Sequence, residues 1–180
     1  MRAILLLAIL GTLAFAAAAG SSSAQSAGFV LSSIAFEKGS PIPGRFTCDG
    51  LDLSPPLQWS GLPEGTKALA LICDDPDAPV GTWDHWLIYN LPPALAGLPE
   101  GVGKSAPLPT GSVEGKNSWG KLGYGGPCPP PGKPHRYFFR LYALKAPLGL
   151  EEGATKAELL AAIKGQLLAT AELVGTYGRP

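Results

Sequence analysis

The two histidines of this 180-residue chain each lie beside residues that could work with an imidazole. His85 comes ten residues after Asp75, and His135 is followed two residues later by Tyr137. A carboxylate that accepts a hydrogen bond from one ring nitrogen holds the imidazole in a single tautomer, and the second nitrogen can then bind a ligand or move a proton. These four residues together suit a small anionic group such as phosphate.

We expect Asp75 to lie close to His85. Asp75 follows one predicted strand and the next predicted strand begins at His85, so two adjacent strand ends could bring the two side chains together. The carboxylate would raise the basicity of the ring and leave its second nitrogen to donate to an anion. In the alternative interpretation, Pro76 and Pro79 shape a rigid turn and His85 is simply a packed side chain. The residues alone favour neither.

A loop rich in glycine and proline, residues 123–131, precedes His135. Gly125 and Gly126 would let main-chain N–H groups approach a ligand closely, although a surface turn has the same composition. His135 and Tyr137 are two residues apart and therefore face the same side of a strand. Trp83 and Trp86 could form walls of the pocket or could pack in the core, and for Trp86 the core is the preferred interpretation.

The elements that must position these residues are mostly strands. Strands are predicted over residues 29–36, 67–73, 86–91 and 137–144, with turn residues between them and no alternation of strands with helices. This arrangement is typical of antiparallel sheets. The long segment between residues 92 and 131 is predicted to be a functional loop.

One helix is predicted near the end of the chain. Thr155 and Glu158 form a capping-box pattern, in which each side chain satisfies a backbone N–H group at the start of the helix. Leu160, Ile163 and the pair Leu167-Leu168 then fall on one face at helical spacing. We expect this face to cover one side of the sheet.

The start of the chain predicts export. Residues 1–24 have the charged, apolar and small-residue order of a secretory signal peptide, and the apolar run is shorter than the roughly 20 residues that span a bilayer. We therefore expect a periplasmic or extracellular protein without stable membrane insertion, with residues 25–180 as a single domain. Its 14 basic and 14 acidic residues balance, which gives no support to nucleic-acid binding.

The three cysteines are expected to have two different roles. Cys73 ends an apolar run and is predicted to be a buried, unreactive thiol. Cys48 and Cys128 lie in loop motifs on either side of the predicted site, and in an oxidising compartment we expect them to form a disulfide. No metal-binding spacing, no nucleophile motif and no nucleotide-binding fingerprint occurs in the sequence, so no metal and no cofactor are predicted.

Several motifs together resemble the phosphatidylethanolamine-binding protein family, in its bacterial Raf-kinase-inhibitor-like (YbhB/YbcL-type) branch. They occur in order at residues 46–50, 54–57, 75–79, 85–86, 123–130 and 135–137. The resemblance covers residues 30–177. It implies a mainly β fold with a large antiparallel sheet, a smaller second sheet and peripheral helices, including one near the C-terminus.

The resemblance also implies a set of ligand-binding residues. Asp75, His85, His135 and Tyr137 match the pocket side chains of the family. The residues that match its pocket lining are Pro76, Pro79, Trp83 and Gly126.

Three functions follow as expectations. The first is a non-enzymatic binding protein whose pocket takes phosphate-type or phospholipid headgroup ligands. The second is a secreted inhibitor that acts on a protease or kinase target through protein contact. The third is a metal-assisted hydrolase that uses Asp75, His85 and His135. The first is preferred because loop donors suit an anion better than a cation, although a fold does not determine a function.

Overall fold

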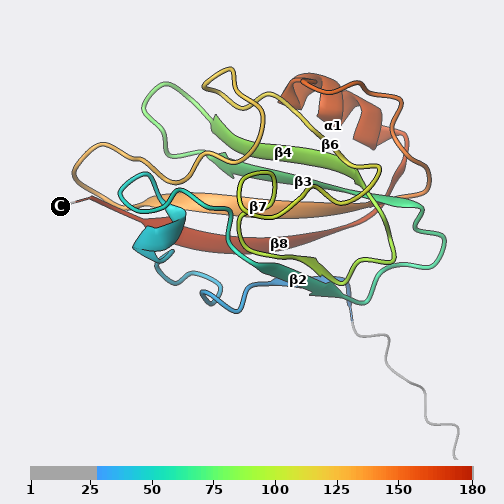
Figure 1. Ribbon diagram of the computed structural model, residues 1–180, viewed down its shortest axis with the longest axis horizontal. Helices are drawn as coiled ribbons and strands as arrows, with labels where there is room; N and C mark the ends of the chain where they lie inside the picture. The colour runs from blue at the N-terminus through green and yellow to red at the C-terminus, as the bar shows by residue number, and fades with distance from the viewer. Residues whose placement is uncertain (1–27, 180) are drawn as a thin grey trace, which may run out of the picture.

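A computed structural model describes residues 28–179 as two antiparallel sheets and one α-helix (Figure 1). The large sheet consists, in pairing order, of β6 (Val113–Glu114), β4 (Trp83–Leu91), β3 (Ala68–Asp75), β7 (His135–Leu144) and β8 (Leu167–Tyr177). The small sheet consists of β1 (Val30–Ser32), β2 (Leu57–Ser60) and β5 (Gly97–Leu98). The predicted mainly β fold with a large and a small sheet is confirmed. The predicted signal peptide lies outside the described residues.

The centre of the large sheet is buried on both faces, as shown by β3, in which all eight residues are buried. Leu69 and Leu71 point toward the small sheet, into a core that Trp59 and Phe139 complete. Ala70, Ile72 and Leu87 face the other way and are covered by α1 (Lys156–Lys164). A continuous apolar run fits a strand with both faces covered, and the sequence shows such a run here.

Three strands of the large sheet, β3, β4 and β7, lie where the sequence predicts them, with small changes at their ends, whereas β6 and β8 were not predicted. β3 extends to Asp75 and β7 begins at His135, so both reach further toward the predicted site than expected. β4 begins at Trp83 rather than at His85. The N-terminal strand, β1, is much shorter than predicted because only three residues pair with β2. Within residues 92–131, the structure forms only β5 and β6 as short strands.

The helix begins as predicted but ends sooner. Thr155 accepts a hydrogen bond from the Glu158 backbone N–H, and both halves of the capping box are present. The helix ends at Lys164, and Gly165 caps it, so Leu167 and Leu168 belong to β8 instead. Both are exposed, as is Leu160, whereas Leu159 and Ile163 are the buried helix residues. The predicted apolar face is confirmed at Ile163 but was wrong at Leu160 and, because β8 pairs with β7 after Gly165, at Leu167 and Leu168.

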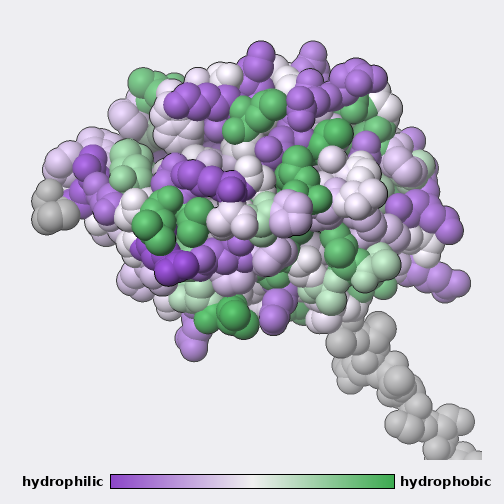
Figure 2. All heavy atoms as spheres, in the orientation of Figure 1, coloured by the Kyte–Doolittle hydropathy of each residue, from purple (hydrophilic) through white to green (hydrophobic). Residues whose placement is uncertain are grey.

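These exposed leucines are part of a mixed surface. Figure 2 shows hydrophobic side chains scattered among polar ones on one face of the molecule. Apolar side chains exposed singly are common in folded proteins and need no partner to explain them. No helix in residues 28–179 is long and apolar enough to cross a membrane.

The three cysteines are divided between a disulfide and a buried thiol. Cys48 and Cys128, which are 80 residues apart in the sequence, are joined by a disulfide. Cys73 is free and buried, and burial raises the pKa of its thiol. The disulfide ties the loop after Phe46 to the proline-rich loop that leads into β7.

Candidate functional site

The position of His85 depends on a β-bulge. Cys73 pairs with Trp86 and Asp74 pairs with Asp84, so His85 has no partner residue on β3. A bulge places one extra residue in a strand and changes the direction of its side chain. Trp86 therefore packs in the core between the sheets, and the His85 ring lies edge-on to Tyr137 on that same face.

The Asp75 carboxylate orients His135. Its Oδ2 accepts a hydrogen bond from His135 Nδ1 at 2.7 Å, and its Oδ1 accepts one from the Asp77 backbone N–H at 2.8 Å. The expected hydrogen bond between Asp75 and His85 is therefore wrong. The physical reason is that β3 pairs with β7 as well as with β4, while the bulge turns His85 toward a different acceptor.

That acceptor is the carbonyl group of Gly125, which lies 2.6 Å from His85 Nδ1. Because a carbonyl oxygen only accepts, Nδ1 carries the proton and Nε2 has the lone pair in the neutral ring. Burial lowers the pKa of His85, and the Gly125 hydrogen bond and the charge of Asp75 offset only part of this effect. The ring is thus held in one neutral tautomer at neutral pH.

Two buried donors near these imidazoles make no hydrogen bond within the described chain. They are Trp83 Nε1 and the Tyr137 hydroxyl. Tyr137 is completely buried, and its ring centre lies 5.1 Å from that of His85. Burial, and then the negative charge of Asp75, raise the pKa of the Tyr137 hydroxyl, so it keeps its proton. Leaving such a donor unpaired in a protein interior costs about 1–3 kcal/mol.

A cavity of about 250 Å³ lies at this end of the sheet. Its lining includes Asp75, Trp83, His85 and His135, which the sequence places in the site. Pro79, which the resemblance also places in the site, lines the cavity as well, and the other lining residues are Ala78, Val80, Trp119, Cys128, Pro129 and Pro130. The structure thus brings together, around one cavity, a carboxylate, two imidazoles and an indole that come from β3, β4 and β7.

Three predicted site residues do not line this cavity. Pro76 is exposed and does not line it, and Tyr137 is completely buried, with its ring packed edge-on against His85. Gly126 lines a neighbouring cavity of about 240 Å³, which shares Trp119 and Cys128 with the first.

The glycine loop does not present free donors, which corrects a further expectation. The Gly125 N–H donates to the His85 carbonyl at 2.9 Å, and the Gly126 N–H donates to Asp52 Oδ1 at 2.6 Å. A side chain at Gly125 would lie 2.6 Å from the Trp119 ring, and one at Gly126 would lie 2.5 Å from the Phe46 carbonyl oxygen. Glycine is needed here for close packing rather than for contact between the loop backbone and a ligand.

Trp119 is a site residue that sequence reasoning did not identify. Its ring packs edge-on against His85, with centroids 5.1 Å apart, and against Trp83 at 5.4 Å. It lines both cavities and is 42% exposed. A tryptophan within a glycine-rich loop was the available signal, but its contact with His85 depends on the fold of the whole loop.

A second missed feature is an ion pair beside the cavity. Arg136 Nε and Nη2 donate to the two carboxylate oxygens of Asp77 at 2.8 and 2.7 Å, and the Arg136 backbone N–H also donates to Oδ2. These contacts lower the pKa of Asp77 to about 2. The pair fixes the turn after β3 against the first residues of β7, next to His135.

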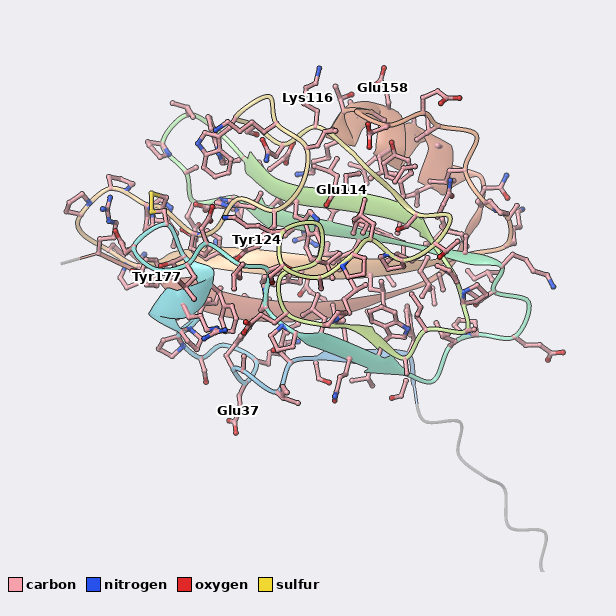
Figure 3. All side chains as sticks on the ribbon, in the orientation of Figure 1. Glu37, Glu114, Lys116, Tyr124, Glu158 and Tyr177 are labelled. Carbon is pink, nitrogen blue, oxygen red and sulfur yellow. A yellow bond between two sulfur atoms is a disulfide. The ribbon has the colours of Figure 1, made fainter. Side chains whose placement is uncertain are left out.

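Polar contacts around the glycine loop and the disulfide hold the rim of the site in place (Figure 3). The Tyr124 hydroxyl donates to the Phe46 carbonyl at 2.8 Å. Asp49, next to the disulfide, accepts hydrogen bonds from the Tyr177 hydroxyl and from Arg179. The loops on both sides of the disulfide are thereby connected to the core and to the end of β8.

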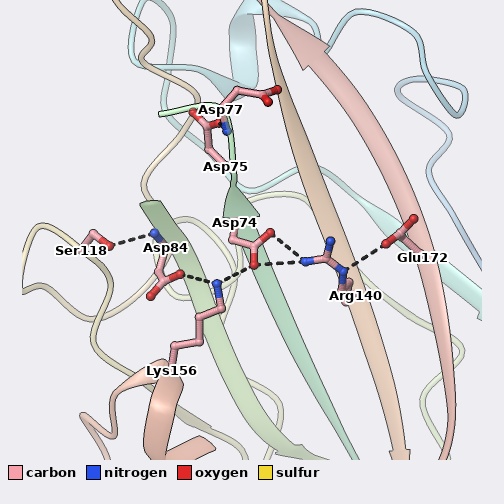
Figure 4. A network of polar contacts seen from close by, with 8 residues as sticks. All are labelled: Asp74, Asp75, Asp77, Asp84, Ser118, Arg140, Lys156 and Glu172. Carbon is pink, nitrogen blue, oxygen red and sulfur yellow. Dashed lines mark hydrogen bonds and ion pairs between the residues drawn. The ribbon is translucent and has the colours of Figure 1, made fainter. Parts of the chain in front are cut away.

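A network of charges occupies the opposite face of the same strand ends (Figure 4). Lys156 Nζ donates to Asp74 at 2.6 Å and to Asp84 at 2.7 Å. Arg140 donates to both carboxylate oxygens of Asp74 and to Glu172. The network connects α1 to β3, β4, β7 and β8.

No group of three or more histidine, cysteine, aspartate or glutamate side chains in residues 28–179 is arranged to hold a metal ion. The polar groups that converge on the cavity are instead hydrogen-bond donors and imidazole nitrogens. Donors of this kind suit an oxyanion.

Comparisons with known proteins agree with the fold. The family described as phosphatidylethanolamine-binding protein matches residues 32–178. A UPF0098 protein of Methanothermobacter thermautotrophicus is 56% identical over 145 residues, which cover 81% of this chain and 95% of the relative. A UPF0098 protein of Chlamydia muridarum is 49% identical over 152 residues, which cover 82% of this chain and 97% of that relative.

Two crystal structures are similar along most of the chain. YbcL of E. coli, described as a new member of the mammalian PEBP family, has a TM-score of 0.81 and 36% identity, covering 86% of this chain and all of its own. A PEBP homologue from Chlamydia trachomatis has a TM-score of 0.78 and 44% identity, covering 85% of this chain and 99% of its own.

Proposed function

The chain belongs to the phosphatidylethanolamine-binding protein family, and on that premise we propose that its cavity binds a small anion of the phosphate type. The anion is either free or the headgroup of a phospholipid, as the name of the family suggests. We further propose that the protein acts by binding alone, without catalysing a reaction. Export, with residues 1–24 as the leader, belongs to the same proposal.

One observation carries the proposal. Trp83 Nε1 and the Tyr137 hydroxyl are buried donors that have no partner among residues 28–179, and they lie beside two imidazoles at one end of the sheet. Few polar groups in a folded protein remain unpaired, and those that do call for an explanation. An oxyanion has several acceptor oxygens in a small volume and can satisfy donors that converge from different strands.

The role of Asp75 supports binding rather than catalysis. Both of its carboxylate oxygens already accept hydrogen bonds, from His135 Nδ1 and from the Asp77 backbone N–H. The carboxylate therefore orients His135, whose Nε2 remains for a ligand. A protonated His135 beside Asp75 would form an ion pair with it and donate from Nε2 to an anion.

A titration of the mature protein with inorganic phosphate and with phosphoethanolamine tests the proposal. We expect saturable changes in the imidazole NMR signals of both His85 and His135, and a measurable heat of binding. The variant His135→Gln should weaken binding about tenfold or more, because it removes the imidazole that Asp75 orients toward the cavity. The matched control is Lys145→Gln, which removes an exposed charge just beyond the other end of β7.

The result that contradicts the proposal is an unchanged histidine spectrum at saturating concentrations of both ligands. Equal weakening by His135→Gln and Lys145→Gln would also contradict it, since that would indicate a general effect of net charge. Thermal unfolding of each variant shows whether lost binding reflects a lost fold.

A further inference from the structure

The hydrogen bonds of His85 restrict which oxyanions the proposed site can hold. His85 Nδ1 lies 2.6 Å from the Gly125 carbonyl oxygen, and the Gly125 N–H in turn donates to the His85 carbonyl at 2.9 Å. Residues 85 and 125 are therefore held together by two hydrogen bonds. The ring cannot reverse its tautomer without losing the contact to Gly125, so Nε2 presents a lone pair to the cavity.

The surroundings of the ring keep it neutral. His85 is 2% exposed, and its neighbours are Tyr137 and His135 from β7, Trp119 from the loop, and the carboxylates of Asp75 and Asp84. Burial lowers the pKa of His85 despite the two negative charges. His85 Nε2 is consequently an acceptor at neutral pH, and a ligand atom beside it must be a donor.

The other groups around the ring have the opposite requirement. Trp83 Nε1 and the Tyr137 hydroxyl are donors without a partner in the described chain, so they need acceptors. His135 donates through Nδ1 to Asp75, which leaves its Nε2 as a donor only when the ring is protonated. A matching ligand has several acceptor oxygens and one O–H group within the same small anion.

We infer that the site selects an oxyanion that carries its own proton, such as monoprotonated phosphate or a phosphate monoester, over a fully ionised one. This inference rests on the proposed function. The P–O–H group donates to His85 Nε2 while the remaining oxygens accept from Trp83 Nε1, from the Tyr137 hydroxyl and, when its ring is protonated, from His135 Nε2. Sulfate and phosphate diesters have no proton to donate near neutral pH, so they place an anionic oxygen against the lone pair.

The inference separates two sources of phosphate. Phosphate monoesters lose their second proton with a pKa of about 6, so a site that stabilises the protonated form can bind it near neutral pH. The headgroup of phosphatidylethanolamine is a diester and lacks that proton. The structure therefore favours inorganic phosphate or a monoester headgroup, such as that of phosphatidic acid, over a diester headgroup.

Calorimetric titration of the mature protein at pH 7.0 with inorganic phosphate, sulfate and dimethyl phosphate tests this selection. Dimethyl phosphate represents the diester headgroup. We expect phosphate to bind at least about tenfold more tightly than either of the other two, which corresponds to one charge-assisted hydrogen bond.

The variant His85→Gln tests the cause of the selection. Its amide group can donate as well as accept, so sulfate should gain affinity and the ratio of the two affinities should approach one. Lys145→Gln is the control and should keep the wild-type ratio. In the wild-type protein without ligand, nitrogen NMR at pH 7.0 should show His85 protonated at Nδ1 and unprotonated at Nε2.

Each outcome distinguishes the two proposals. Equal affinities for phosphate, sulfate and dimethyl phosphate at pH 7.0 would overturn the selection and leave anion binding intact. Absence of binding by all three would overturn both proposals. A free His85 that is protonated at Nε2 would overturn the selection whatever the affinities are, even if His85→Gln fails to fold.

Discussion

Adjacent residues of the same strands form two very different polar groups. Asp74 and Asp84 point toward α1 and join a network in which Lys156 and Arg140 bind their carboxylates. Asp75 and His85, the next residue in each strand, face the cavity, and nearby Trp83 Nε1 and the Tyr137 hydroxyl have no partner in the part of the chain that the structure describes. One face satisfies its charges within the chain, and the other leaves donors and a lone pair unused.

The two faces of these strand ends have different roles, as the pairing of their charges shows. Asp74 and Asp84 are direct cross-strand partners, and like charges in that position repel. Lys156 Nζ lies between them, and burial of its ammonium group is outweighed by the two carboxylates, which raise the pKa of Lys156. The network therefore stabilises the fold. Incomplete pairing on the other face costs stability, which a bound ligand would restore.

The largest expected effect comes from breaking the paired face. Lys156→Met leaves two carboxylates opposite each other, one of them with only 5% of its side chain exposed. We expect the free energy of unfolding to fall by about 3 kcal/mol, because Arg140 still pairs with Asp74 but Asp84 loses its ion pair and faces the Asp74 carboxylate. Urea denaturation of the variant measures this loss.

A matched change at the edge of that network serves as the control. Glu172→Gln removes the exposed partner of Arg140 and should cost less than about 1 kcal/mol. If both variants lose the same stability, the contrast between the two faces is not supported.

A smaller effect, of opposite sign, is expected on the cavity face. Tyr137→Phe removes a buried hydroxyl that makes no hydrogen bond in the described chain. The variant should unfold at a higher urea concentration, with a gain of about 1 kcal/mol, and should bind phosphate less tightly. A loss of stability without loss of phosphate affinity would assign the hydroxyl a structural role instead.

The smallest effect is expected at the rim, where Asp77 pairs with Arg136. Because the pKa of Asp77 is lowered to about 2 in the folded chain, its stabilisation is complete above pH 4 and is lost as the pH falls toward 2. The pair is partly exposed, so we expect less than about 1 kcal/mol. Asp77→Asn should flatten the pH dependence of unfolding between pH 4 and pH 2, as measured against the wild-type protein. An unchanged pH profile would show that the pair contributes nothing measurable.

The outcome for the predicted site can be traced to particular residues. His135 and Tyr137 share a face of β7 because residues two apart in a strand always do. The partner of Asp75 could not be predicted in the same way. Asp75 lies on β3, between β4, which carries His85, and β7, which carries His135, so an imidazole is available on each side. Because of the bulge, His85 forms its hydrogen bond with the Gly125 carbonyl group, and the Asp75 carboxylate accepts its hydrogen bond from His135 instead.

Prediction of α1 from the sequence was limited in the same way, because it succeeded only where neighbouring residues decide the structure. Thr155 and Glu158 specify where α1 begins, since a capping box involves only residues within one turn. Its end depends on β8, which removes Leu167 and Leu168 from the helix by pairing with β7. Local signals predicted the start, and a contact between distant strands decided the end.

The sequence alone was sufficient to predict the mainly β architecture, the four apolar segments and the location of the polar motifs at the ends of strands. These properties follow from periodicity and turn chemistry, which act over a few residues. Only the tertiary structure decided which imidazole meets Asp75, which nitrogen of His85 faces the cavity and which donors remain unpaired. Those choices depend on strand order, on one bulge and on loop packing, because each brings together residues far apart in the chain.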